Sequence, residues 1–294
     1  MKVKKAIITA AGLGTRFLPI TKAVPKPMLP VMDTPTIQYI MDEIKRAGIE
    51  KTAIIVSGNS SVIKDHFGKA EVLENNLKET GKKELYDIAM KTRSYGDIEF
   101  IVQPTPNGLA GALLCAEEFV NGEPFALLLG DEIYDAKENS TPCLSKLVSE
   151  FESTGVSQIA AMETFGDDIS KYGNFAVKDV NGKNAVYDII EKPALCDALS
   201  NLSAMGRYVL GADIFEFIKE LFAKNIKGEV YLTDALKNLG NAEGKGLYAC
   251  PFDDDRYDIG DKAGYIKANI AYALKNDKLK EDLTDFIKEL AEKL

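Results

Sequence analysis

Side chains that serve many catalytic sites are scarce in this sequence. Its 294 residues include no tryptophan, one histidine and four cysteines, and the cysteines lack the paired spacing of a metal site. This composition does not favour a Ser-His-Asp triad or a histidine zinc centre. His66 is interpreted as a surface residue, and the cysteines as small buried hydrophobic residues in a reducing compartment.

Charge and hydropathy exclude two further classes of protein. The formal net charge is −9, whereas proteins that bind nucleic acids broadly are usually basic, so we expect no nucleic-acid partner. No apolar run approaches the length that crosses a bilayer. Met1–Lys5 leads into a strand-length run without a signal-peptide pattern. We therefore expect a cytoplasmic protein without membrane contact.

Strand-length apolar runs alternate with helical patterns in the first part of the chain. The runs lie at residues 6–9, 52–57, 98–102, 125–129 and 157–162. Thr34 and Pro35 predict a helix start, as N-cap and first helical residue. The charged segment 71–93 predicts a helical excursion from the core or an interface element. The alternation predicts an α/β fold with a Rossmann-like, doubly wound, mostly parallel sheet flanked by helices, which binds ligands at the carboxyl ends of its strands.

The pattern changes after about residue 170 to strands joined by turns. Asn181-Gly182 predicts a hairpin between strands at 175–180 and 185–191. A further strand is expected at 204–210, and helices at about 213–223, 232–240, 263–274 and 280–293. Because no repeat, low-complexity tract or clear linker interrupts the chain, we expect one domain with a smaller β-rich region and C-terminal helices.

The loop that follows the first strand carries the strongest functional signal. Gly12 and Gly14 let the backbone approach a ligand, and consecutive backbone N–H groups in such a loop bind anions. Arg16 and the proline-flanked Lys26 suit a polyphosphate. Phe17 stands where a dinucleotide-binding fingerprint needs a glycine, and the loop lacks the Gly-Lys-Ser/Thr of a Walker motif. The alternative is a plain turn with solvated cations.

The order Gly-x-Gly-Thr-Arg followed by Pro-Lys-Pro-Met-Leu-Pro resembles the sugar-nucleotide pyrophosphorylase (nucleotidyltransferase) family. The resemblance runs from about Lys4 to about Leu274. Within the family, the chain is most similar to bacterial uridylyltransferases, which carry a similar insertion at 71–93. The other motifs that carry the resemblance are Asp33–Tyr39, Leu129–Asp131, Glu191–Pro193, Gly206–Tyr208 and Tyr257–Asp261.

The resemblance implies both a domain organisation and a reaction. One nucleotidyltransferase domain would span residues 1–294, with a nucleotide-binding part at about 1–170, a sugar-binding part at about 171–262 and C-terminal helices at about 263–294. UTP and glucose 1-phosphate would give UDP-glucose and pyrophosphate by in-line attack on the α-phosphorus. Because the sugar phosphate is already an anionic nucleophile, the reaction needs alignment and charge stabilisation. A homo-oligomer, dimer or tetramer, is also implied.

The predicted catalytic residues carry the charges that such a reaction requires. Arg16 and Lys26 are candidates for binding the leaving phosphates, and Lys192 for contacting the sugar phosphate. By resemblance, the backbone of the opening loop wraps the nucleotide, through Ala10, Ala11, Gly12 and Gly14.

A magnesium site is predicted at Asp131, which follows an apolar strand and Gly130. Mg²⁺ takes one or two carboxylates together with phosphate oxygens and water. Asp258 matches the second acidic position of the wider family and is the second predicted ligand. The alternative for Asp131 is a plain turn residue. The acidic segment 253–255 is interpreted as a solvated turn.

The base and the sugar have separate predicted sites. Gln103 and Gly108 are predicted to bind uracil, because a side-chain amide both donates and accepts hydrogen bonds; the alternative is a proline-stiffened loop before a helix. Glu191 is predicted to accept from sugar hydroxyls beside Lys192, and by resemblance Gly173 lines the sugar pocket. The alternative for the Glu191-Lys192 pair is an ordinary charged strand end.

One segment departs from the uridylyltransferase pattern. Those enzymes usually have a Lys-Gly-Leu-Gly-His-Ala type stretch at the base loop, whereas residues 107–112 read Asn-Gly-Leu-Ala-Gly-Ala, nearer to the thymidylyltransferases. A dTTP-using glucose-1-phosphate thymidylyltransferase is therefore one alternative, opposed by the insertion at 71–93 and by Gly206–Tyr208. A non-catalytic, ligand-sensing relative is the other, opposed by the retained charged residues.

Overall fold

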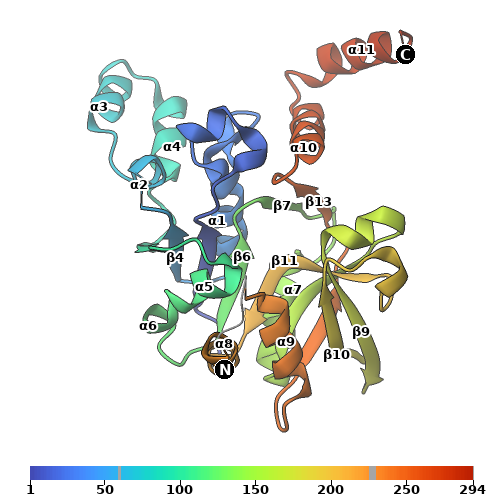
Figure 1. Cartoon of the computed structure of the whole chain (residues 1–294). Helices are drawn as coiled ribbons and strands as arrows, with labels where there is room; N and C mark the ends of the chain where they lie inside the picture. Colours follow the sequence, from blue (N-terminus) through green and yellow to red (C-terminus); the bar gives the residue numbers. More distant parts are fainter. Residues whose placement is uncertain (59–60, 225–229, 294) are drawn as a thin grey trace.

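One β-sheet forms the centre of the molecule (Figure 1). The computed structural model describes residues 1–58, 61–224 and 230–293. Within these ranges, nine strands follow the order β5-β4-β1-β6-β11-β8-β12-β10-β9. Their bounds are β1 Lys5–Ala10, β4 Lys51–Val56, β5 Asp97–Val102, β6 Phe125–Leu129, β8 Ser157–Glu163, β9 Gly173–Val180, β10 Lys183–Glu191, β11 Leu202–Leu210 and β12 Leu247–Pro251.

The sheet is parallel in its first half and mixed in its second. Strands β5, β4, β1 and β6 pair in parallel, so the carboxyl ends of β1 and β6 lie side by side. Strand β11 runs antiparallel to β6 and β8, and β10 runs antiparallel to β12 and β9. The α/β class is confirmed, but the antiparallel pairings of β11 and β10 make the sheet less parallel than predicted. Asn181 and Gly182 form the predicted β9–β10 turn, with φ of 55° and 76°.

Helices cover both faces of the sheet. Because successive strand residues point to opposite faces, Ile7 enters the apolar cluster under α5, α8 and α9, while Ile8 enters the cluster under α1 and α7. Helix α1 begins one residue later than predicted, since Pro35 is its N-cap. Pro35 also pairs with Pro30 in a short antiparallel ladder of β2 Pro30–Val31 and β3 Thr34–Pro35. The bounds are α1 Thr36–Arg46, α5 Gly108–Leu114, α7 Cys143–Thr154, α8 Ile214–Ala223 and α9 Leu232–Asn241.

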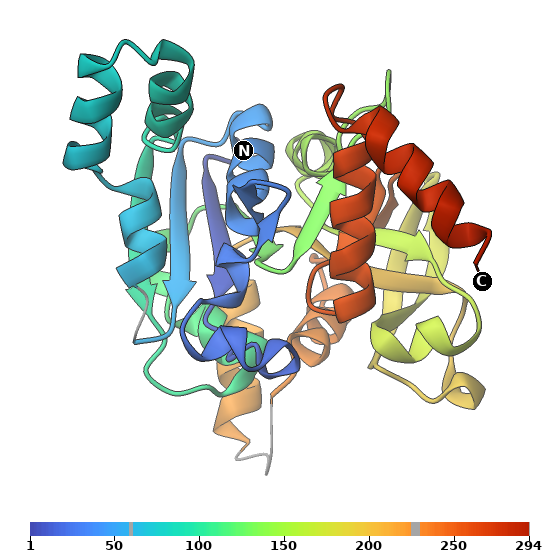
Figure 2. The ribbon, with the colours of Figure 1, turned by 90° about the horizontal axis from the view of Figure 1, so that it is seen from above.

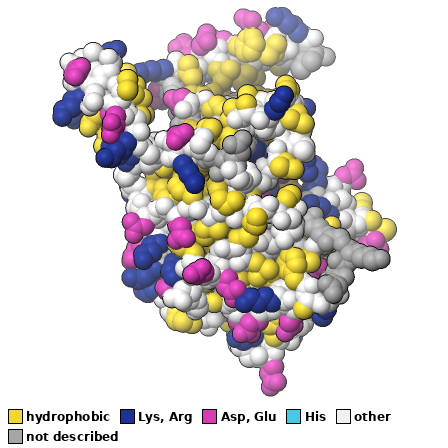
Figure 3. Space-filling model, turned by 60° about the vertical axis from the view of Figure 1, so that its left-hand side comes forward, with side chains coloured by type: hydrophobic (Ala, Val, Ile, Leu, Met, Phe, Trp, Pro, Cys, Tyr) yellow, Lys and Arg dark blue, Asp and Glu magenta, His cyan; other side chains and the backbone are white. Residues whose placement is uncertain are grey.

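The charged segment 71–93 forms a projecting arm of two helices, α3 Glu71–Glu79 and α4 Lys83–Lys91. Gly81, with φ of 69°, lies in the turn between them. The arm stands out from the body and has hydrophobic side chains on its surface (Figure 3). Val72 and Ile88 are among its exposed hydrophobic residues. The predicted helical excursion is confirmed.

The C-terminal helices α10 Lys262–Leu274 and α11 Lys280–Ala291 stand at the opposite end of the molecule from this arm (Figures 1 and 2). A two-stranded sheet of β7 Glu132–Asp135 and β13 Asp255–Asp258, which the sequence did not predict, leads into α10. In the described ranges, no helix has both the length and the apolar character needed to cross a membrane.

Three smaller predictions are corrected. Asp254 was predicted to lie in a solvated turn, but it is buried. Its Oδ2 accepts a hydrogen bond from the backbone N of Cys143 at the start of α7 (2.9 Å). Cys196, expected in the interior, is exposed. His66 is half-buried, with Nε2 3.0 Å from Oε1 of Gln38.

Candidate active site

Two adjoining cavities lie at the carboxyl ends of β1 and β6. The first, which we call the loop cavity, has a volume of about 670 Å³ and is lined by the opening loop and the segment 103–109. The second, the hairpin cavity, has a volume of about 320 Å³ and is lined by the β9–β10 hairpin and β11. Both are lined by Leu109, Leu129 and Asp131, so the cavities meet at Asp131.

The predicted site residues divide between these two cavities. The loop cavity contains Ala10, Ala11, Gly12, Lys26, Gln103, Gly108 and Asp131. The hairpin cavity contains Arg16, Asp131, Gly173, Glu191, Lys192 and Asp258. Residues far apart in the sequence are therefore brought to one place.

Gly130 sets the position of Asp131. Its backbone N donates to the carbonyl of Thr9 at the end of β1 (3.1 Å), and a Cβ on Gly130 would lie 2.4 Å from that oxygen. Any side chain there would push the ends of β1 and β6 apart. The glycine therefore holds Asp131 beside the opening loop.

Asp131 is paired with Lys26, whose Nζ lies 2.5 Å from Oδ2. Lys26 lies between Pro25 and Pro27 and is the first residue of a short 3₁₀ helix, Lys26–Met28. The two prolines restrict the backbone on either side of it. An ammonium group has three donors, so Lys26 can keep this contact and also donate to a phosphate.

Asp131 and Asp258 converge beside Gly260. A Cβ on Gly260 would lie 2.7 Å from Oδ2 of Asp131 and 3.0 Å from Oδ1 of Asp258. Burial raises the pKa of Asp258, and the negative charges of Glu132 and Asp131 raise it further. A divalent cation near these carboxylates would relieve that repulsion.

The donor set fits magnesium bound together with a substrate. Within the described part of the chain, no group of three or more His, Cys, Asp or Glu side chains could hold a metal alone. Mg²⁺ rarely uses such a cage, because it takes one or two carboxylates and completes its shell with phosphates and water. The convergence of Asp131 and Asp258 suits this mode of binding.

The opening loop contributes to both cavities. Arg16 lines the hairpin cavity and donates from Nη1 to the carbonyl of Gly260 (3.2 Å). Gly14 is not among the described lining residues of either cavity. Its φ of 64° suits glycine, and a Cβ there would lie 2.9 Å from the Thr21 side chain. Gly14 therefore determines the conformation of the loop without lining either cavity. The phosphate contact of Arg16 stays a prediction.

The buried side chain of Gln103 forms hydrogen bonds with the predicted base loop. Its Nε2 donates to Oδ1 of Asn107 (2.9 Å) and to the carbonyl of Gly108 (3.3 Å). Gly108 begins α5 with φ of 88°, a value that favours glycine. Both predicted base residues thus lie in the wall of the loop cavity.

The end of the β9–β10 hairpin carries the predicted sugar residues. A Cβ on Gly173 would lie 3.0 Å from Cγ2 of Thr233 and 3.4 Å from Oε2 of Glu191, so the glycine leaves space beside this carboxylate. Lys192 has φ of 47° and its backbone N donates to the carbonyl of Tyr172 (3.1 Å). A non-glycine residue in this conformation costs on the order of 1–3 kcal/mol, and such strain concentrates at functional sites.

Sequence and structure comparisons agree on the family. A sequence model described as nucleotidyl transferase matches residues 5–275. The chain belongs to the nucleotidyl transferase family. It is 42% identical over 290 residues to UTP–glucose-1-phosphate uridylyltransferase 2 of Staphylococcus saprophyticus, and the match covers 98% of each chain.

Two solved structures show the same architecture. A UTP-bound UGPase from Acinetobacter baumannii has a TM-score of 0.88 and 32% identity, over 98% of this chain and 99% of that chain. A UDP-glucose pyrophosphorylase complexed with UDP-glucose has a TM-score of 0.81 and 36% identity, over 93% of this chain and 100% of that chain.

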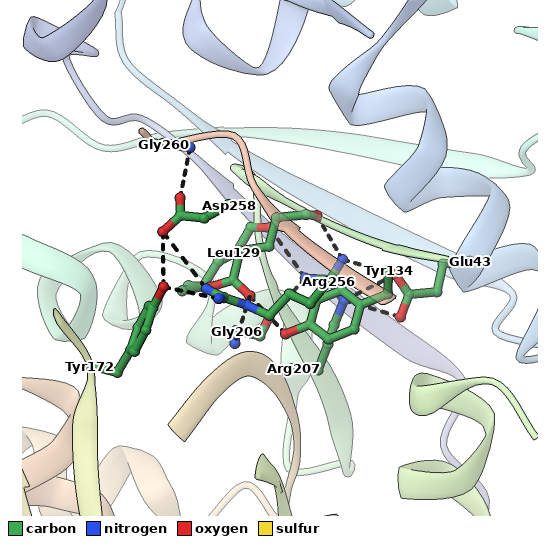
Figure 4. A network of polar contacts seen from close by, with 10 residues as sticks. Glu43, Leu129, Tyr134, Tyr172, Gly206, Arg207, Arg256, Asp258 and Gly260 are labelled. Carbon is green, nitrogen blue, oxygen red and sulfur yellow. Dashed lines mark hydrogen bonds and ion pairs between the residues drawn. The ribbon is translucent and has the colours of Figure 1, made fainter. Parts of the chain in front are cut away.

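In this member of the nucleotidyl transferase family, a buried polar network supports the site (Figure 4). Arg256 donates from Nε to Oε2 of Glu132 (2.7 Å) and from Nη1 to the hydroxyl of Tyr172 (3.0 Å). The same hydroxyl donates to Oδ2 of Asp258 (3.4 Å). Nη2 of Arg256 lies 3.8 Å from that oxygen. The orientation of Asp258 is therefore tied to Arg256 and Tyr172.

Glu132 is the negative centre of this network. It also accepts from the hydroxyl of Tyr134 (2.7 Å) and the backbone N of Gly206 (3.1 Å). Burial alone would raise the pKa of Glu132, but the charge of Arg256 and its hydrogen bond lower the pKa to about 2. The pair therefore stays ionised in the interior.

Glu132, Tyr172 and Arg256 were not predicted from the sequence, although each is within two positions of a predicted site residue. One signal was available for Arg256. It is two residues before Asp258, and residues two apart in a strand lie on the same face.

Proposed function

We propose that this protein transfers a uridylyl group from UTP to glucose 1-phosphate, which gives UDP-glucose and pyrophosphate. The observation that carries the proposal is the meeting of the loop cavity and the hairpin cavity at Asp131. The glycine-bearing opening loop lines one cavity, and Glu191 and Lys192 line the other. A nucleotide and a sugar phosphate would therefore bind end to end. The names of the relatives support this pair of substrates.

The reaction requires alignment more than proton transfer. An oxygen of the sugar phosphate attacks the α-phosphorus of UTP, and the bond from that phosphorus to the pyrophosphate oxygen breaks. Lys26, in the wall of the loop cavity, would bind the leaving phosphates. Lys192, in the wall of the hairpin cavity, would hold the sugar phosphate, and Arg16 would add positive charge from the same side. Glu191 would accept hydrogen bonds from the sugar hydroxyls.

Magnesium is the proposed cofactor. Asp131 would be its principal ligand and Asp258 an auxiliary one, because their oxygens converge beside Gly260. The ion would neutralise phosphate charge that Arg16 and Lys26 alone cannot balance in a protein of net charge −9.

The proposal is tested with purified protein, UTP, glucose 1-phosphate and Mg²⁺. Pyrophosphate release is expected, together with UDP-glucose formation, reversal by added pyrophosphate and inhibition by EDTA. No turnover with any common nucleoside triphosphate would overturn the proposal.

A second candidate function is thymidylyl transfer from dTTP. It is favoured by the base loop, in which Asn107 and Gly111 stand where uridylyltransferases usually have lysine and histidine. The same assay with dTTP separates the two functions. We expect measurable use of dTTP beside preferred use of UTP, and strict UTP selectivity would show that the altered loop is neutral.

We also propose a homo-oligomer, dimer or tetramer. Helix α11 has no buried residue and exposes Phe286 and Leu290. Isolated helices of this length are marginal in water, so burial against another copy would stabilise it. Beside α10, an apolar groove of about 580 Å³ adds exposed surface, lined by Phe17, Leu18, Pro19, Ile20, Ala23, Lys262, Tyr265 and Ile266. Light scattering that shows a monomer at micromolar concentration would contradict this proposal.

A cytoplasmic location is the final part of the proposal. All four cysteines are free thiols, which suits a reducing compartment. Fractionation of cells that express the protein would test it.

A further inference from the structure

Asn107 occupies the space above Gly111 in the loop cavity's base loop. Asn107 is the N-cap of α5, and Gly111 lies one turn into that helix. A Cβ on Gly111 would lie 1.9 Å from Oδ1 and 2.5 Å from Nδ2 of Asn107. Real Cβ atoms do not pack this closely, so Asn107 keeps its position only because residue 111 is glycine. The two residues form a matched pair, and both depart from the lysine and histidine of the usual uridylyltransferase stretch.

This pair fixes one end of Gln103. Nε2 of Gln103 donates to Oδ1 of Asn107 (2.9 Å) and to the carbonyl of Gly108 (3.3 Å). A backbone carbonyl can only accept, so it determines which end of the amide faces α5. Both bonds use the amide nitrogen, and Oε1 is the end left for a ligand. Gln103 is buried in the cavity wall, where a lost bond is not replaced by bulk water.

We propose that Asn107 is a positioning residue for base selection, which locks the Gln103 amide so that Oε1 is a fixed acceptor. Uracil and thymine present an N–H donor at N3, whereas cytosine presents a lone pair there. A fixed acceptor therefore matches uracil and thymine and opposes cytosine. A freely turning amide would present its NH₂ to cytosine and lose this discrimination. The inference rests on the proposed uridylyl transfer and deepens it on the base side.

The test is a comparison of kcat/KM for UTP, dTTP and CTP with glucose 1-phosphate. In Asn107→Ala the CTP-to-UTP ratio should rise roughly tenfold, because one of two bonds that hold the amide is gone. The dTTP-to-UTP ratio should not change, since both bases carry the N3 donor. The KM for glucose 1-phosphate should also stay the same, because its proposed site lies in the other cavity.

Two further variants separate positioning from simple loop damage. Asn107→Asp keeps an acceptor for Nε2 and should retain the wild-type CTP-to-UTP ratio. Gly111→Ala places a methyl group where Asn107 lies and should raise the ratio as Asn107→Ala does. Asn184→Ala, on β10 outside both cavities, is the matched control, and melting curves establish that each variant is folded.

The outcomes are distinct. An unchanged CTP-to-UTP ratio in folded Asn107→Ala overturns the inference while uridylyl transfer stands. A parallel loss with UTP, dTTP and CTP also overturns it, because the loop would then be only structural. If the wild-type protein turns over no nucleotide, uridylyl transfer itself fails, and this inference fails with it.

Discussion

Nζ of Lys26 lies 2.5 Å from Oδ2 of Asp131, so a cation and a carboxylate of the proposed site form a direct ion pair. Their side chains are 18% and 28% exposed. Pairs that contact solvent contribute little to stability. The pair therefore matters more for placing two opposite charges at the boundary of the cavities than for folding. Substitutions here should change catalysis more than the melting temperature.

Asp131→Asn should lower kcat by a factor on the order of 10²–10⁴, because a metal's charge stabilisation is worth several kcal/mol. Asp258→Asn should cost less, since water can complete the Mg²⁺ shell. The measurement is a Mg²⁺ titration of pyrophosphate release beside a melting curve. Asp253→Asn, which breaks an exposed pair with Lys137, is the control and should keep wild-type activity. Full activity of Asp131→Asn at an unshifted Mg²⁺ midpoint would contradict the assignment of Asp131 as a metal ligand. A larger loss of kcat in Asp258→Asn would mean that Asp258 is the principal ligand and Asp131 the auxiliary one.

Gly260→Ala should weaken Mg²⁺ binding without unfolding the protein. The added methyl group would lie 2.7 Å from Oδ2 of Asp131 and 3.0 Å from Oδ1 of Asp258, so the two carboxylates must move apart. The expected result is a metal midpoint that is roughly tenfold higher. It is measured for Mg²⁺ from activity and for Mn²⁺ by direct titration. Gly58→Ala, whose Cβ has open space, is the control. Equal midpoints for both variants would show that the carboxylates adjust freely.

Glu191→Ala and Lys192→Ala should separate sugar binding from catalysis. Glu191→Ala should raise the KM for glucose 1-phosphate far more than that for UTP, because the carboxylate is assigned to sugar hydroxyls. Lys192→Ala should lower kcat as well, since its charge lies near the reacting phosphates. Steady-state kinetics with each substrate varied in turn measures both effects. If both variants keep the wild-type kcat and KM values, the end of the β9–β10 hairpin has only a structural role.

Much of the fold followed from local sequence patterns. Three of the parallel strands, β1, β4 and β6, are short and mostly apolar runs. The β9–β10 hairpin is marked by Asn181-Gly182. The opening loop, Asp131 and Glu191-Lys192 were predicted because each has a local motif. The structure adds that these motifs meet at two adjoining cavities.

The parts that the sequence did not predict depend on contacts across long separations. Strands β7 and β13 have four residues each, and they pair with one another across more than a hundred residues of sequence. Asp254 looked solvated because its partner, the start of α7, is 111 residues away in the sequence. The role of Arg256 emerges only when β7 places Glu132 beside it. The sequence pattern of β7 or of β13 alone does not indicate that the two strands pair.

Glu132→Gln should reduce the free energy of unfolding in a pH-dependent way. Arg256 holds the pKa of Glu132 at about 2, below its ordinary value of 4.5, despite the opposing effect of burial. A depressed carboxylate pKa stabilises the folded state fully above the unfolded value and loses that contribution as the pH falls through the folded one. At neutral pH the variant leaves Arg256 without its buried partner, which costs on the order of 3–5 kcal/mol. Urea unfolding of both proteins should therefore show a large difference at pH 7 that shrinks as the pH falls from about 4.5 towards about 2. Lys137→Met, at an exposed pair, provides a control whose difference from wild type should be small at every pH. A Glu132→Gln difference that does not vary with pH would mean that Glu132 gains no stability from its ionised form.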